Sequence, residues 1–294
     1  MHHPCLAQQL RIAGLTTVSL IAFAANSILS RLALGRGAID AASFSTIRLL
    51  SGALVLMLLT RLAGRRTMES QGSWRSGAAL SLYAICFSFA YLLLDTGTGA
   101  LFLFGSVQTT MIIAGLASGE RPTAAQWLGL LIAIAGLILL VLPGVSSPSP
   151  AGAALMAAAG ICWGLYSLRG RGADNPIRIT TGNFIRAVPF AVAVSVIMLP
   201  TAHLSAKGVV IASLSGGIAS GLGYVAWYTA MRGLTATMAA TAQLSVPVLA
   251  AAGGVFFLSE TASARLVFSG LTILGGVGLA IVGRTRSARQ RTID

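Results

Sequence analysis

Amide and aromatic side chains interrupt the long apolar stretches of this chain at places where they could bind an organic solute. Trp and Tyr offer a flat apolar surface with one hydrogen-bond donor, and Asn and Gln carry both donors and acceptors. Polar groups within hydrocarbon need partners, so these side chains should face the interior of a helix bundle. The candidates for lining a binding cavity are Trp163, Tyr166, Gln243, Asn26, Tyr83, Gln108, Asn183, Tyr224 and Trp227.

Trp163 and Tyr166 are the best placed of these candidates, because both lie near the middle of one apolar run. The alternative for each candidate is a hydrogen bond between helices or an anchor at the membrane interface. Trp74 and Trp127, near the ends of their runs, fit the interface anchor better. Taken together, the candidates predict a cavity that binds a small organic molecule.

Two arginines, Arg48 and Arg186, lie inside apolar runs, and each follows an isoleucine. An arginine at the bilayer centre costs about 2.5–3.5 kcal/mol on insertion scales, so it should face the protein interior, a cavity or a lipid headgroup. The two could bind an anionic group or hold a gate. Alternatively, they could cap helix-end carbonyls or extend towards headgroups. They are 138 residues apart, which is the first sign of a duplication.

Other matching residues recur at nearly the same offset. Glu120 and Glu260 are 140 residues apart, as are Ser27 and Ser167. Matches that cluster at one offset predict an internal repeat. We expect both glutamates to be structural, because a carboxylate near a helix N-terminus is stabilised by the helix dipole. A gating role is the alternative.

Two prolines, Pro189 and Pro247, lie inside predicted helices. Each removes a backbone hydrogen bond and can kink its helix. Kinked or broken helices often line the binding sites of transporters, so both prolines are structural or gating candidates. A simple bend is the alternative.

Several kinds of chemistry are missing from the sequence. None of its seven carboxylates lies deep in a predicted helix. Coupling to protons or sodium usually uses a carboxylate or histidine within the membrane, so we expect facilitated transport down a solute gradient. There is also no Walker motif, no Ser-His-Asp set and no metal-ligand pattern. We therefore predict no catalytic residue, no metal, no cofactor and no enzyme activity.

The composition is that of an integral membrane protein. Of 294 residues, 55% are hydrophobic and only 9% are charged, and the mean hydropathy is +0.84. Soluble domains carry about 25% charged residues. The net charge of +13 would suit nucleic acid only on a basic folded domain, which this chain lacks. A lipid bilayer and a small solute are the expected partners.

Ten apolar stretches approach the length that a membrane-spanning helix needs, which predicts an all-α fold. The first resembles a signal peptide, but its apolar residues continue to Leu34, so we expect a helix there. The Pro- and Ser-rich segment 146–150 predicts an extended linker between a five-helix repeat over 1–145 and a second over 151–294 with a basic tail. The stretches cover 12–34, 40–60, 75–94, 98–118, 124–143, 151–168, 177–199, 208–230, 235–258 and 265–283.

Arginine and lysine are distributed unequally between the two sides of the predicted bundle. With the N-terminus placed inside, 14 fall in inside segments and three in outside segments. The positive-inside rule then predicts cytoplasmic termini in a multi-pass protein of the inner membrane. Because each repeat has five helices, the second would enter from the opposite face. That is the inverted repeat typical of secondary transporters.

Two short motifs resemble those of a known family. The segment 119–123 (Gly-Glu-Arg-Pro-Thr), followed by Gln-Trp-Leu-Gly at 126–129, is similar to the signature of the drug/metabolite transporter superfamily, EamA type. Ser-Glu-Thr at 259–261 with Gly270 looks like its second copy.

Three further positions carry the same resemblance. Arg48 and Arg186 match the arginine that opens the second helix of each repeat, and Trp163 with the following glycine matches the Trp-Gly of the first helix. The first half departs from this pattern, with Ala24-Ala25 before Asn26. The first helix of the N-terminal half thus lacks a counterpart of Trp163, and no such role is expected there.

The resemblance implies ten helices in two inverted repeats, a central cavity and solute export. Among family members, the chain looks most like the bacterial aromatic amino-acid exporters of the YddG kind. The leading hypothesis is thus an exporter of amino acids, aromatic ones first, that works by alternating access. The alternatives are an exporter of another small metabolite or drug, a non-transporting membrane subunit and, more distantly, an enzyme acting on lipids. The oligomeric state stays open, and a monomer is compatible with the sequence.

Overall fold

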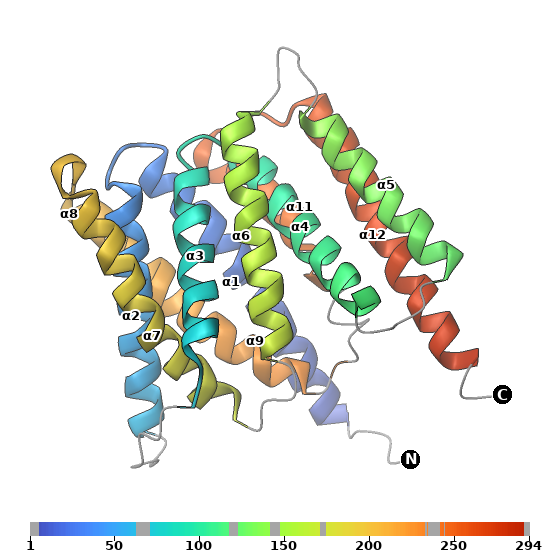
Figure 1. The fold of residues 1–294 in the computed structure, drawn as a ribbon, viewed down its shortest axis with the longest axis horizontal. Coiled ribbons are helices and arrows are strands. Elements are labelled where there is room, and N and C mark those ends of the chain that lie inside the picture. The colour runs from blue at the N-terminus through green and yellow to red at the C-terminus, as the bar shows by residue number, and fades with distance from the viewer. Residues whose placement is uncertain are drawn as a thin grey trace.

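The computed structural model describes residues 6–62, 71–117, 123–141, 148–170, 175–232, 234, 242–243 and 245–290. These residues are mainly helical, and their one β-bridge, between Ile39 and Leu204, is isolated. In chain order the helices (Figure 1) are α1 (Leu6–Leu34), α2 (Ala41–Leu62), α3 (Trp74–Ala90), α4 (Thr96–Ala117), α5 (Ala124–Val141), α6 (Pro150–Arg169), α7 (Pro176–Ile197), the short η1 (Leu199–Thr201), α8 (Ala206–Leu214), η2 (Ser215–Leu222), α9 (Gly223–Met231), α11 (Ser245–Leu258) and α12 (Ala264–Gln290).

Where the structure describes both, the predicted apolar stretches and the observed helices agree to within four residues, with two exceptions: α1 begins six residues before the predicted start, and α12 ends seven residues after the predicted end. Among the described residues, five helical stretches are long and apolar enough to cross a membrane. Three shorter apolar helices cover Trp127–Gly136, Ser245–Leu258 and Ala264–Gly276. The stretch predicted at 235–258 lies partly outside the described residues, so the total of ten spans stays a prediction.

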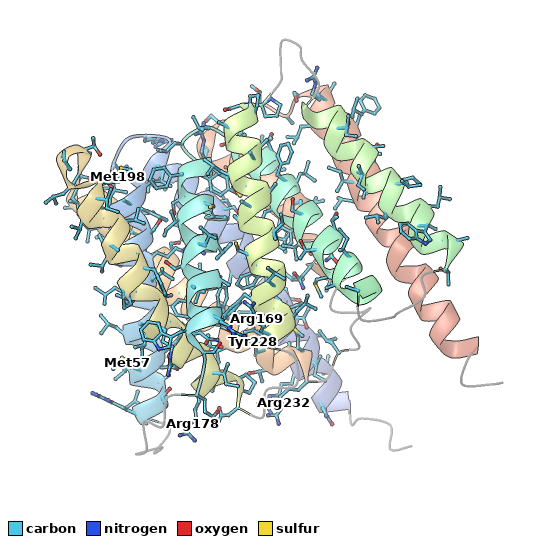
Figure 2. All side chains as sticks on the ribbon, in the orientation of Figure 1. Met57, Arg169, Arg178, Met198, Tyr228 and Arg232 are labelled. Atoms are coloured by element: carbon cyan, nitrogen blue, oxygen red, sulfur yellow. The ribbon has the colours of Figure 1, made fainter. Side chains whose placement is uncertain are left out.

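Apolar side chains cover the outside of the bundle and polar ones lie within it, which is the reverse of a soluble domain. Ile197 and Phe256 are 71% and 84% exposed, whereas Asn26 and Asn183 are buried. Figure 2 shows carbon-rich side chains projecting from the outer faces of the helices. Lipid tails solvate such a surface, and polar groups avoid them by facing protein.

The helices pack in a pattern that relates the first part of the chain to the second. α1 packs against α9 and α11, while α6 packs against α3 and α4. α2 packs against α7, and α5 lies alongside α12 at one edge of the molecule (Figure 1). The two halves of the chain are therefore interleaved along these contacts.

The segment from Ala206 to Met231 is continuously helical, but its middle, η2, has π-helical hydrogen bonding. η2 is rich in small residues, and it packs closely on α2 and α1. A Cβ at Gly216 would overlap the backbone oxygen of Arg48 and the hydroxyl of Ser51. The missing side chain at Gly216 is what lets the two backbones approach. π-helical turns occur often at functional sites.

The two ends of the bundle differ in their charged residues. α1 begins and α12 ends at the lower side of the view, where Arg178 and Arg232 also lie, while Met198 marks the opposite end (Figures 1 and 2). At the Met198 end, backbone bonds join the α1–α2 and α7–α8 connections, from Asp40 N to the oxygen of His203 at 2.9 Å and from Ser205 N to the oxygen of Ala38 at 3.1 Å.

Asp40 caps the N-terminus of α2 and also holds the α7–α8 connection. Its Oδ1 accepts from Ser43 N at 2.8 Å, and its Oδ2 accepts from His203 N at 3.0 Å. Partial burial alone would raise the pKa of the Asp40 carboxyl, but these hydrogen bonds outweigh it and the pKa lies below its ordinary value. The ionised carboxylate therefore stabilises the fold at neutral pH.

Replacing Asp40 with Ala should lower the free energy of unfolding by about 0.5–2 kcal/mol, the usual cost of a lost N-cap. Because the folded pKa is depressed, the contribution of Asp40 is present above about pH 3.9 and is lost as the pH falls further through the folded pKa. Thermal unfolding of the detergent-solubilised protein at a series of pH values measures this. Asp40→Asn, the matched control, keeps the acceptor and should flatten the acid limb. An unchanged acid limb in that variant would contradict the assignment.

Candidate functional site

A small cavity lies where α1, α3, α4, α6 and α9 meet near the centre of the bundle. Its free volume is about 20 Å³. That volume holds a water molecule or two but no amino acid, so the structure is closed around it. A solute could enter only after these helices move apart. The lining residues are Phe23, Asn26, Ser27, Tyr83, Phe87, Leu103, Phe104, Trp163 and Tyr224.

Trp163 is the hub of the aromatic side chains around this cavity. Its ring centroid lies 4.7 Å from that of Tyr224, 5.0 Å from that of Tyr83 and 5.6 Å from that of Tyr166. Phe23 meets it edge-on at 6.2 Å. Rings from α1, α3, α6 and α9 thus pack on one indole, and rings in such tilted or edge-on pairs attract each other beyond their buried area.

Arg48 lies beside the same cluster, on α2. Its side chain is almost fully buried, at 1% exposure. Nη2 donates to the Tyr83 hydroxyl at 2.9 Å, and Nε donates to Ser220 Oγ of η2 at 3.1 Å. The guanidinium carbon lies 5.2 Å from the ring centroid of Tyr83 and 4.8 Å from that of Phe87. Arg48 therefore contacts the cavity wall from behind.

Two predicted asparagines hold neighbouring elements in place. Asn26 lines the cavity, and its Oδ1 accepts a short hydrogen bond from Ser215, the first residue of η2. Asn183 accepts from Ser73 N at 3.1 Å and so supports the start of α3. The Asn26 side chain thus joins the cavity directly to the π-helical segment.

A second, smaller hollow of about 10 Å³ lies next to the first, and Tyr166 and Asn183 line it. Tyr228 lines it as well, and Figure 2 places Tyr228 in the lower half of the molecule near Arg169. Tyr166 in the wall of this hollow packs on Trp163 in the wall of the central cavity, with ring centroids 5.6 Å apart.

The remaining predicted cavity residues, Trp227, Gln108 and Gln243, are not among the residues that line the cavity. Trp227 packs edge-on against Phe23 at 5.6 Å. Gln108 is buried one helical turn after the lining residue Phe104, and its Nε2 has no hydrogen-bond partner among the described residues. Gln243 is buried at 8% exposure.

Glu260 connects three parts of the chain at the end of the bundle opposite Arg178 and Arg232. Its carboxylate accepts from the backbone N–H of Thr96 at 2.9 and 3.1 Å and from the Thr96 hydroxyl at 2.9 Å. Arg31 Nε lies 3.4 Å from Oε1, and Arg31 also pairs with Asp95 at 3.1 Å. Burial raises the pKa of the Glu260 carboxyl, against the bonds from Thr96, which lower it. Glu260 therefore caps α4 across the structure, whereas Ser263 Oγ accepts from Leu266 N at the start of α12, the helix that follows Glu260 in sequence.

The other structural or gating candidates are more peripheral. Arg186 donates to the oxygen of Gly182, one turn back in its own helix, at 3.0 Å, and lies 6.0 Å from the Trp74 ring. Pro189 is exposed on α7, and Pro247 is buried near the start of α11. Glu120 lies outside the described residues.

Phenylalanines form much of the cavity wall, although no feature of the sequence distinguishes them from other apolar residues. Phe23, Phe87 and Phe104 all line the cavity. In sequence they are ordinary members of apolar runs, since a Phe has no polar atom that would require an interior position. Ser27 and Ser220 were missed for a similar reason, because helical serines can bond to their own backbone. In the part of the chain that the structure describes, no group of three or more His, Cys, Asp or Glu side chains could hold a metal ion.

Comparison with known families decides the class of protein. The profile of the EamA-like transporter family matches residues 11–142 and matches again at residues 150–282. The chain belongs to the EamA-like transporter family. This EamA-like transporter is therefore a multi-pass membrane protein of a family of transporters, not of enzymes.

Two bacterial proteins are similar in sequence to this EamA-like transporter. It is 48% identical over 277 residues to the uncharacterized protein PA1977 of Pseudomonas aeruginosa, an alignment that covers 94% of this chain and 96% of that protein. It is 31% identical over 193 residues to the threonine/homoserine exporter RhtA of Escherichia coli, covering 63% of this chain and 62% of RhtA. A solved crystal structure with 21% identity has the same fold, with a TM-score of 0.65 over 90% of this chain and 96% of the other.

Proposed function

We propose that this EamA-like transporter exports amino acids, aromatic ones first, across the inner membrane by alternating access through the central cavity. The observation that carries the proposal is the wall of rings from five helices, interrupted by Asn26, Ser27 and two tyrosine hydroxyls. Rings suit an apolar side chain, and the polar groups suit the ends of a zwitterion. The cavity is closed in this structure, so export requires it to open in turn to the two sides.

The architecture that we propose is two inverted five-helix repeats with both termini in the cytoplasm. The double match of the family profile supports a duplication. So does the matched packing, in which α1 contacts α9 and α11 as α6 contacts α3 and α4. Arg178 and Arg232 lie at the end where α1 begins and α12 ends, which the positive-inside rule would make the cytoplasmic end.

A second candidate substrate class is small hydroxylated amino acids, favoured by the similarity to the threonine/homoserine exporter. The cavity wall favours the aromatic class, because six of its nine lining residues carry rings that can pack on an aromatic side chain. Uptake of labelled tryptophan, phenylalanine, threonine and homoserine into liposomes containing the purified protein compares the two, with alanine and a cationic dye as further solutes.

We expect saturable flux of the aromatic amino acids that a proton ionophore does not change. The described carboxylates, Asp40, Asp95 and Glu260, all lie in connections between helices, away from the cavity. Proton flux in a fixed ratio to the solute would contradict facilitated transport. Flux of threonine and homoserine alone would replace the aromatic class with the second one. No flux of any solute through protein shown to be folded would favour a non-transporting subunit.

A further inference from the structure

The charge of Arg48 has no anionic partner among the described residues. Both ion pairs found there belong to Arg31, at the end of the bundle. Two of the five N–H groups of Arg48 are used, one by Ser220 and one by Tyr83. Nη1 is buried and has no hydrogen-bond partner in that part of the chain. Burying a cation with an unused donor costs free energy in this state. An anion that binds Arg48 in another state of the protein would remove that cost.

The compensation visible in this structure comes from two rings of the cavity wall. The guanidinium carbon of Arg48 lies 5.2 Å from the ring centroid of Tyr83 and 4.8 Å from that of Phe87. Both rings also line the cavity. Such cation–π contacts contribute up to about 2 kcal/mol each when they are desolvated. A carboxylate bonds more strongly, because the planar guanidinium can donate two parallel hydrogen bonds to it.

We propose that Arg48 is the anion-recognition residue of the transport site, and that the transported solute carries a carboxylate. When the cavity opens, the carboxylate takes the place of the Phe87 ring beside Arg48 and accepts from Nη1. Tyr83 keeps its bond to Nη2 and forms one side of the site. This inference rests on the proposed transport function and assigns the residue that recognises the carboxylate of the transported solute.

Arg186 serves as a matched control because its sequence neighbour is the same and its surroundings are different. It is less buried than Arg48 and donates to a carbonyl of its own helix. It does not line the central cavity. Replacing Arg186 therefore removes the same side chain from the corresponding position of the other half while leaving the cavity wall intact.

The test compares solutes that differ only in the carboxylate. Proteoliposomes carrying wild type, Arg48→Gln, Arg48→Lys or Arg186→Gln receive labelled L-phenylalanine or L-phenylalaninamide, and L-threonine or L-threoninamide. In wild type and in Arg186→Gln we expect the KM of the acid to be at least about tenfold below that of the amide, the usual effect of a charged hydrogen bond. Arg48→Gln should abolish this ratio. Arg48→Lys should reduce it, since an ammonium cannot form the paired bonds.

The outcomes separate the site from the function. Equal KM values for acid and amide in wild type, or an unchanged ratio in Arg48→Gln, would overturn the role of Arg48 and leave transport standing. If Arg48→Gln fails to fold, an unchanged ratio in Arg48→Lys has the same meaning.

If no solute moves, thermal unfolding of the same proteins with phenylalanine, threonine or phenylacetate decides the question. A stabilising shift in wild type and Arg186→Gln that the folded Arg48 variant lacks would support the anion site without transport. The absence of a shift in wild type would overturn both the anion site at Arg48 and the proposed transport function.

Discussion

Trp163→Ala should lower the free energy of unfolding by about 3–5 kcal/mol, the range measured for large aromatic residues in packed cores. Four rings pack on the indole of Trp163, from four different helices. Removing it leaves a void that those rings fill only in part. Export of an aromatic amino acid should fall at least about tenfold per folded molecule, because the cavity would lose its central wall.

Unfolding in detergent and flux in proteoliposomes measure the two effects separately. Trp163→Phe keeps a ring at the site and should recover part of both. Trp127→Ala is the matched control, since Trp127 lies on the outer surface at 48% exposure. A flux per folded molecule that is the same for Trp163→Ala and Trp127→Ala would contradict the place of Trp163 in the transport site.

Gly216→Ala should destabilise the protein by about 1–3 kcal/mol or more, the cost of overpacking, although it adds a single methyl group. The new Cβ would overlap the backbone oxygen of Arg48 and the Ser51 hydroxyl, and backbone on α2 cannot rotate away as a side chain can. η2 would have to move off α2. That movement would stretch the bond between Arg48 and Ser220 and so couple a stability effect to the transport site.

Gly275→Ala is the control, because a Cβ on that α12 residue would meet no described atom within 4 Å. It should be neutral or slightly stabilising, as alanine favours helix more than glycine does. Thermal unfolding of both variants in one detergent makes the comparison. Equal stability of the two would show that α2 and η2 do not pack as closely as described.

The sequence predicts the helices well for a physical reason. Lipid imposes long apolar runs, and the few charges fall between them, so hydropathy alone locates α2, α6 and α7 to within two residues. The capping role of Glu260 was predicted in kind but not in partner. The N–H groups at a helix N-terminus stabilise any carboxylate that the fold brings to them. Only the fold shows that the N–H donated to Glu260 belongs to Thr96, the first residue of α4.

The site could be predicted only in part. Asn26, Tyr83, Trp163 and Tyr224 line the cavity as expected, because polar and amphipathic groups within hydrocarbon must face protein. Lining phenylalanines give no such signal, since a Phe is equally stable against lipid. The two arginines share their sequence context, yet one bonds across the bundle and the other to its own helix. Their difference arises from tertiary contacts that a single sequence does not reveal.

The π-helical winding of Ser215–Leu222 determines which side chains of α9 face the cavity. Each residue of an α-helix advances by about 100° around the axis, and a π turn takes one residue more than an α turn. Tyr224 and Trp227 are therefore rotated from where an uninterrupted α-helix beginning at Ala206 would place them. The small residues of η2 line no part of the cavity, yet they thus determine the direction in which the aromatic side chains of α9 point from the helix axis. Losing one residue from this segment would change which solute fits while every lining residue kept its identity.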